Sequence, residues 1–168
     1  INARHEQGVA YMAFGYAQST GKPGVYAVVP GPGILNTTAA LSTAYACNSR
    51  VLAITGQIPS SYIGRELGML HEIPNQLSVL EGLTKFAKRI NYPSDAPAIV
   101  SEAFKNMRSG RPRPTAIEMP MDIMQHKSEV ALRTFTDGYS PPAADPDLIK
   151  EAALILGAAK NPVIFVGT

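Results

Sequence analysis

Short apolar runs recur along this chain, and several of them are bounded by glycine or proline. They are GVYAVV at 24–29, VLAIT at 51–55, TAIEM at 115–119 and PVIFV at 162–166, with KFAKRI at 85–90 as a weaker fifth run. Short, largely apolar runs of this length are typical of strands that are covered on both faces. Because helical patterns lie between the runs, we expect an α/β fold in which a parallel sheet carries helices on both faces.

The segments between these runs have apolar residues three and four positions apart, as in amphipathic helices. The first pattern comprises Val9, Met12, Ala13 and Tyr16, the second runs from Leu35 to Tyr45, and the third covers 98–107. A fourth helix is expected after an N-cap at Asp145 or Asp147 and runs to about Ala159. Its expected buried side consists of Leu148, Ile149, Ala152, Ile155, Leu156 and Ala159.

The composition and hydrophobic periodicity of the chain predict three parts. Residues 1–120 form the first α/β domain, the polar and proline-bearing segment 121–144 is a linker, and residues 145–168 begin a second α/β domain. The first helical pattern follows Ile1 with no strand before it, and the chain ends at a strand and a glycine. We therefore expect a slice of a longer polypeptide.

Charge and composition argue against several classes of function. The 15 basic and 13 acidic residues are spread along the chain, which does not favour binding to nucleic acid. No apolar run approaches the ~20 residues that a membrane span needs. Cys47 is the only cysteine, so no internal disulfide forms and a reducing cytoplasm is the simplest location. The three histidines, His5, His71 and His126, are too scattered to indicate a metal site.

Glu6 lies at the start of an apolar-faced helical pattern and has two interpretations. In an apolar pocket, desolvation would raise the pKa of its carboxyl and allow it to hold or give a proton near neutral pH. Alternatively, an acid in a first helical turn is stabilised by the helix dipole by ~0.3–1 kcal/mol. His5 beside it could shuttle protons or simply cap the helix.

Two loops at the ends of expected strands carry glycine and polar residues. PGPGILN at 30–36 is either a ligand-binding turn, with a phosphate site as one version, or a tight strand-to-helix connection. TGQIPSSYIG at 55–64 places Gln57 at the carboxyl edge of the sheet, where open α/β folds bind ligands. His71 and Glu72 could form an acid/base pair or lie in a solvated loop.

Three segments, RHEQGVAYMAFGYAQSTGKPGV, VVPGPGILNT and VLAITGQIPSSYIG, occur here in an order and spacing that together resemble a known family. The chain resembles, from about Asn2 to Asp122, the pyrimidine-binding domain of thiamine-diphosphate-dependent enzymes, with the closest likeness in the acetolactate synthase and pyruvate oxidase group. The last 25 residues resemble the start of that group's central domain. The resemblance implies an enzyme that decarboxylates a 2-oxo acid and ligates the acyl unit to an acceptor.

The resemblance also implies roles for individual residues. The glutamate matching Glu6 bonds ring nitrogen N1′ of the cofactor's aminopyrimidine and exchanges a proton there. Pro32 and Asn36 are expected near the pyrimidine, and Gln57 at the mouth of the site. The family's subunits share their sites, so the resemblance implies a homo-oligomer, at least a dimer, whose neighbouring subunit supplies the diphosphate-binding domain. That domain, with its Mg²⁺ motif, is absent here, so this slice alone is expected to be inactive.

Two departures from the family pattern leave the substrate open. Acetolactate synthases continue after the TGQ loop with an Asp-Ala-Phe-Gln-Glu segment, whereas this chain reads RELGMLHEIPNQL, which makes His71 a candidate substrate contact. Pro30 replaces the Ser or Thr usual before Gly-Pro-Gly. A simple 2-oxo acid decarboxylase, an oxidase, an acyl-CoA-type member, a non-catalytic α/β binding domain and a nucleotide-binding regulator therefore remain alternatives, and FAD as a further cofactor is left open.

Overall fold

The computed structural model describes residues 1–132 and 140–166. It divides into two compact units, Ile1–Asp137 and Gly138–Thr168, each of which is described by itself. Part of the predicted linker at 121–144, residues 133–139, lies outside the described residues.

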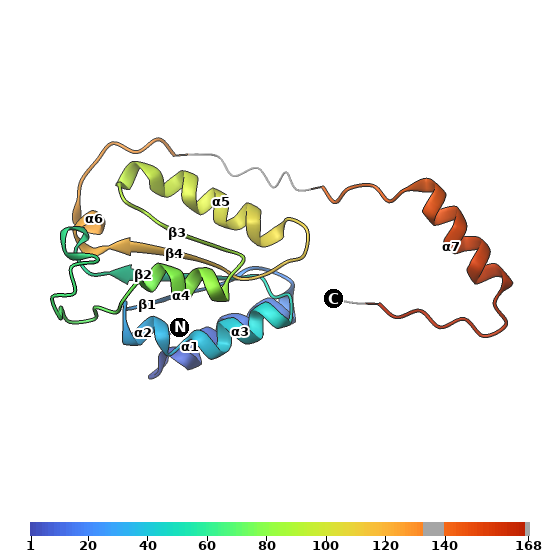
Figure 1. The fold of residues 1–168 in the computed structure, drawn as a ribbon, viewed down its shortest axis with the longest axis horizontal. Coiled ribbons are helices and arrows are strands. Elements are labelled where there is room, and N and C mark those ends of the chain that lie inside the picture. Colours follow the sequence, from blue (N-terminus) through green and yellow to red (C-terminus); the bar gives the residue numbers. More distant parts are fainter. Residues whose placement is uncertain (133–139, 167–168) are drawn as a thin grey trace. The chain divides into compact units, whose positions relative to one another are not determined.

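The first unit is built on a parallel sheet of four strands (Figure 1). Its order is β1-β2-β4-β3, with β1 at Gly24–Val28, β2 at Val51–Gln57, β3 at Phe86–Arg89 and β4 at Thr115–Pro120. The register pairs Gly24 with Val51 and Thr115 with both Leu52 and Phe86. The predicted α/β class and its parallel sheet are confirmed, as is the weaker strand candidate at 85–90.

Helices cover both faces of this sheet. They are α1 Glu6–Thr20, α2 Pro32–Leu35, α3 Thr38–Ala46, α4 Gln76–Leu83, α5 Ala96–Arg108 and α6 Met121–Gln125, with short 3₁₀ turns at Ser60–Tyr62 and Pro93–Asp95. α1, α3 and α4 bury Ala53 and Ala116 of the sheet on one face, whereas α5 buries Leu52 and Ile117 on the other. Alternating strand residues thus face opposite cores, as two-sided burial requires.

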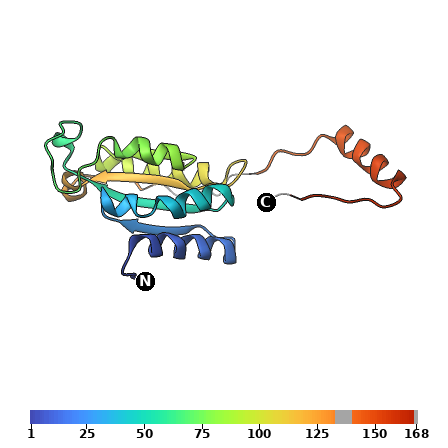
Figure 2. The same ribbon diagram turned by 60° about the horizontal axis from the view of Figure 1, so that its bottom comes forward.

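The buried face of α1 agrees only in part with the predicted one, since Ala13 is buried and Val9 packs against the core. Ala10, Ala13 and Ala17 are buried, whereas Met12 and Tyr16 are 44% and 49% exposed. The reason is the closeness of α1 to β1 (Figure 2): a Cβ placed on Gly24 would lie 2.0 Å from the Ala13 carbonyl oxygen. At this separation alanine side chains fit between helix and strand and Met12 and Tyr16 turn outward, whereas Val9 and Phe14 are partly buried against the same core.

The second predicted helix is divided into α2 and α3 at Thr37. The Thr37 hydroxyl donates to the Ile34 carbonyl oxygen at 2.7 Å and accepts from the Tyr26 hydroxyl at 2.9 Å. A buried threonine that bonds the preceding turn competes with the regular helical ladder. This short α2 places the loop after β1 at the carboxyl edge of the sheet.

In the second unit, helix α7 covers Pro146–Ala158 and begins at the predicted N-cap, where the Asp145 carboxylate accepts from the Asp147 N–H at 2.9 Å. Its expected buried residues are exposed, for example Leu148 at 64% and Ile155 at 63%. The predicted strand at 162–166 is wrong, because this segment pairs with no neighbouring strand among residues 140–166. A strand requires a partner for its N–H and C=O groups. Across the described ranges, no helix is both long and apolar enough to span a bilayer.

Candidate functional site

The carboxyl ends of the parallel strands meet at one edge of the sheet, and the candidate site lies there. The Gly-Pro-Gly loop, residues 30–36, follows β1, whereas Gln57 ends β2 and the loop containing His71 follows it. The start of α1 returns to the same edge, because Glu6 contacts Asn36 in the Gly-Pro-Gly loop. Segments that are far apart in the sequence thus converge where open α/β sheets bind ligands.

Glu6 and Asn36, which are 30 positions apart, form a side-chain hydrogen bond. The Asn36 amide Nδ2 donates to Glu6 Oε2 at 3.1 Å. Gly33 lies beside this pair, since a Cβ placed on it would come within 3.8 Å of Glu6 Cγ and within 2.5 Å of Val29 Cγ2. A side chain at position 33 would therefore crowd the wall beside the carboxylate.

In this chain the carboxyl of Glu6 is ionised at neutral pH, contrary to the expectation of a raised pKa. A hydrogen bond from its own backbone N–H, followed by the bond from Asn36, lowers its pKa, and desolvation offsets this only in part. Glu6 lies in the first turn of α1, and the His5 ring caps that helix by accepting from the Gln7 N–H at 3.1 Å. Hydrogen bonds to the charged form therefore outweigh burial at this position.

The Gly-Pro-Gly loop depends on Gly31, whose backbone conformation favours glycine. Gly31 has φ 60° and ψ −118°, and a Cβ there would lie 2.4 Å from the His71 carbonyl oxygen. Pro32 is exposed and begins α2 without an N–H, and the Gly31 N–H is already bonded to Gln76. Neither position therefore offers a free amide donor to a phosphate, which argues against that alternative.

We expect Gly31→Ala to lower the free energy of unfolding by about 2 kcal/mol or more, because alanine is strained at positive φ and its Cβ would overlap the His71 carbonyl. Gly21→Ala is the matched control, because Gly21 also has a positive φ of 67° but open space around a Cβ. Urea denaturation of both variants measures the difference. Equal losses would show that the contact with His71 contributes nothing.

Glu118 forms the centre of a buried polar network beneath this edge. It is 0% exposed and accepts from three side chains: Arg89 Nε at 2.5 Å, Gln76 Nε2 at 2.8 Å and Gln57 Nε2 at 3.4 Å. Gln57 is itself buried, and its Oε1 accepts from the Ile58 N–H at 2.8 Å. Gln57 therefore lies at the carboxyl end of β2, as expected, but most of its polar atoms are bonded within the protein.

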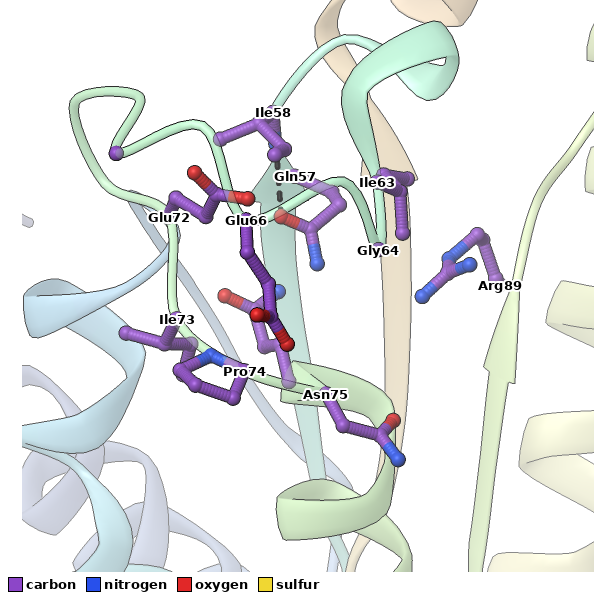
Figure 3. Close-up of a pocket in the computed structure, with 12 residues that line it drawn as sticks. Gln57, Ile58, Ile63, Gly64, Glu66, Glu72, Ile73, Pro74, Asn75 and Arg89 are labelled. Atoms are coloured by element: carbon purple, nitrogen blue, oxygen red, sulfur yellow. Dashed lines mark hydrogen bonds between the residues drawn. The ribbon is translucent and has the colours of Figure 1, made fainter.

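A cavity of about 600 Å³ opens beside this network (Figure 3). Glu72 and Arg89 lie on opposite sides of it with Gln57 between them. Glu72 Oε2 accepts from the Met69 N–H at 2.8 Å, which closes a turn of the loop. The complete lining is Gln57, Ile58, Ile63, Gly64, Glu66, Gly68, Glu72, Ile73, Pro74, Asn75, Gln76 and Arg89.

The predicted residues do not all share one cavity. Glu6 lines a second cavity of about 480 Å³ between residues 1–9 and the edge strand β1. His71 is half-buried with φ 69°, and its backbone contacts the Gly-Pro-Gly loop. The structure thus joins Glu6 with Asn36, places His71 against Gly31, and leaves Gln57 in the Glu118 network.

The residues of that network other than Gln57 were missed from the sequence. The sequence does contain one sign of this network, since Glu118 is a single acid in the run TAIEM. A carboxylate inside a strand that is covered on both faces needs a paired cation. Arg89 and Gln76 carried no comparable signal, since both lie at the ends of weakly patterned segments.

Comparison with known proteins gives one family match. Residues 1–79 match the family model described as "Thiamine pyrophosphate enzyme, N-terminal TPP binding domain". The chain is 37% identical to an acetolactate synthase of Arthrospira platensis, over 98% of this chain and 29% of that protein. It is 34% identical to a probable 2-ketoarginine decarboxylase of Pseudomonas aeruginosa, over 99% of this chain and 30% of that protein.

A solved structure has the same fold. A thiamine diphosphate-dependent 4-hydroxybenzoylformate decarboxylase of Rhodococcus jostii superposes with a TM-score of 0.83 at 24% identity, over 95% of this chain and 30% of that chain. The chain therefore spans about three tenths of the length of the proteins that it matches.

Proposed function

We propose that this chain, which belongs to the thiamine pyrophosphate enzyme family, is the pyrimidine-binding part of an enzyme that decarboxylates a 2-oxo acid. The observation that carries the proposal is the Glu6–Asn36 pair beside Gly33. It presents a carboxylate at the sheet edge where α/β folds bind ligands. Residues 1–120 are proposed as the pyrimidine-binding domain, 121–144 as the linker and 145–168 as the start of the central domain.

The residues at this edge fit the aminopyrimidine of thiamine diphosphate. Asn36 donates to Glu6 Oε2 and orients the carboxylate, and a cavity of about 480 Å³ borders Glu6. The exposed Pro32 offers a flat apolar surface in the same loop. A carboxylate next to a flat apolar surface suits a heteroaromatic ring with a basic nitrogen.

When bound, thiamine diphosphate supplies an electron sink for the decarboxylation of 2-oxo acids. The role proposed for this chain is to hold a proton between Glu6 and ring nitrogen N1′. Glu6 is ionised in the free chain, and covering it with an aromatic ring would raise its pKa by desolvation. Asn36 positions that carboxylate, and Gln57 and His71 are proposed to contact the substrate region.

The remaining parts of the enzyme are proposed by analogy with its relatives. The substrate is a 2-oxo acid, and acetolactate synthesis is the preferred reaction, because an acetolactate synthase is 37% identical to this chain. A simple decarboxylase is the second candidate, favoured by the likeness to a probable 2-ketoarginine decarboxylase and by the altered segment around His71. We propose a cytoplasmic homo-oligomer in which a neighbouring subunit supplies the diphosphate-binding domain and Mg²⁺.

Product analysis with pyruvate tests this proposal. The protein carrying this chain, supplied with thiamine diphosphate and Mg²⁺, is expected to release carbon dioxide and to form acetolactate. Acetaldehyde as the only product would favour the simple decarboxylase, and the visible absorbance of the purified protein would detect flavin. Failure to bind thiamine diphosphate in calorimetry would contradict the enzyme and favour a non-catalytic α/β domain.

A further inference from the structure

Gln76 is the first residue of α4, yet its side chain points into the protein rather than to solvent. It is 1% exposed, and the preceding Asn75 has a left-handed backbone conformation with φ 47°. The Asn75 side chain caps the helix by accepting from the Ser78 N–H. Asn75 thus provides the N-cap, and the polar end of Gln76 is available for other bonds.

Both ends of the Gln76 amide are bonded within the protein. Its Oε1 accepts from the Gly31 N–H at 2.8 Å, and its Nε2 donates to the Gly56 carbonyl oxygen at 3.0 Å and to Glu118 Oε2 at 2.8 Å. The two acceptors around Nε2 and the single donor opposite Oε1 fix the orientation of the amide. No other uncharged side chain of similar length offers both functions.

These bonds connect the Gly-Pro-Gly loop to the rigid sheet. Gly31 has a backbone conformation that favours glycine, and its N–H is bonded to a side chain 45 positions away. Pro32 follows Gly31 directly, and four residues later Asn36 bonds Glu6. The single turn of α2 therefore connects Gly31 directly to the Glu6–Asn36 pair.

We propose that Gln76 is a positioning residue that fixes the Gly-Pro-Gly loop, and through it Asn36 and Glu6, in the arrangement that receives the cofactor. The loop geometry stands on the hydrogen bonds alone, whereas its consequence for cofactor binding rests on the proposed function. The hydrogen bonds of the Gln76 side chain go to Gly31, Gly56 and Glu118, so the proposed action on the pair runs through Gly31.

Hydrogen–deuterium exchange of the full protein without cofactor tests the loop geometry. In Gln76→Met, which keeps the side chain's length but loses both polar functions, we expect exchange of the Gly31 amide to rise roughly tenfold. Amides in the centres of β2 and α5 should exchange at the rate of the unmodified protein. Gln125→Met makes the same change at an exposed glutamine and is the matched control, with no expected change.

Two further measurements test the proposal: amide exchange in the unmodified protein and calorimetry with thiamine diphosphate. In the unmodified protein the Gly31 amide should already exchange slowly, and fast exchange there would overturn the proposal even if the variant failed to fold. Calorimetry should show thiamine diphosphate binding about tenfold more weakly to Gln76→Met. If Gly31 exchanged faster in Gln76→Met but the affinity for thiamine diphosphate were unchanged, the positioning role would be overturned. If the unmodified protein bound no thiamine diphosphate, the proposed function would be refuted. The exchange result would then still decide the loop geometry.

Discussion

Glu6→Gln is expected to lower the rate of proton exchange at C2 of bound thiamine diphosphate by at least about 10²-fold, because an amide can neither accept nor release the proton that general acid–base catalysis requires. The substitution preserves shape, since the glutamine oxygen can still accept from Asn36 Nδ2. The unfolding temperature should therefore change little. Proton NMR of the C2 hydrogen in deuterated buffer measures the exchange in the cofactor-saturated protein.

Glu81→Gln provides the control, because Glu81 is an exposed acid on α4. The same loss of one negative charge there should leave the exchange rate unchanged. If Glu6→Gln exchanged at the rate of the unmodified protein while binding the cofactor normally, the proton-holding role would have to move to another group. A variant that bound no cofactor would instead assign Glu6 to binding.

The fold could be predicted because its signal is local. Runs such as VLAIT and TAIEM are apolar at most positions without alternating, and burial on both faces of a sheet accounts for that pattern. The face of α1 was predicted only in part, for the opposite reason. Its choice depends on a distance between backbones, set by Gly24 against Ala13, and spacing within one helix contains no information about how closely a strand approaches.

The run at 162–166 shows a limit of reading strands from composition. Its apolar, β-branched residues favour an extended backbone, but a strand exists only where a neighbour completes the ladder of hydrogen bonds. Within residues 140–166 no such neighbour is present, and Phe165 is 94% exposed. Strand propensity alone therefore does not provide the pairing that defines a strand.

The candidate site was predicted in part for a related reason. The motifs indicated Glu6, Asn36 and the Gly-Pro-Gly loop, and the structure places these side by side. The role of Gln76 could not be predicted, because its partner Gly31 lies 45 positions away and a single glutamine after an asparagine resembles an ordinary helix start. Long-range side-chain to backbone bonds of this kind leave no periodic trace in a sequence.

Arg89→Met is expected to lower the free energy of unfolding by about 3 kcal/mol, because it leaves the fully buried carboxylate of Glu118 without its cation. The two glutamines that remain bonded to it carry no charge. Arg89 is 22% exposed, and this partial access to water places the expected loss at the lower end of the range for broken buried pairs. Urea denaturation measures the loss.

The neighbouring residue on β3 offers an internal control. Lys88 also pairs with a glutamate, Glu102, at 3.2 Å, but both side chains are about half exposed. Lys88→Met should therefore cost no more than about 0.5 kcal/mol. Because the cost of Arg89→Met comes from the charge left behind, adding Glu118→Gln to that variant should recover part of the stability. Two outcomes would show that Arg89 does not neutralise the buried carboxylate. One is a loss of unfolding free energy in Arg89→Met as small as that in Lys88→Met. The other is a double variant that is less stable than Arg89→Met alone.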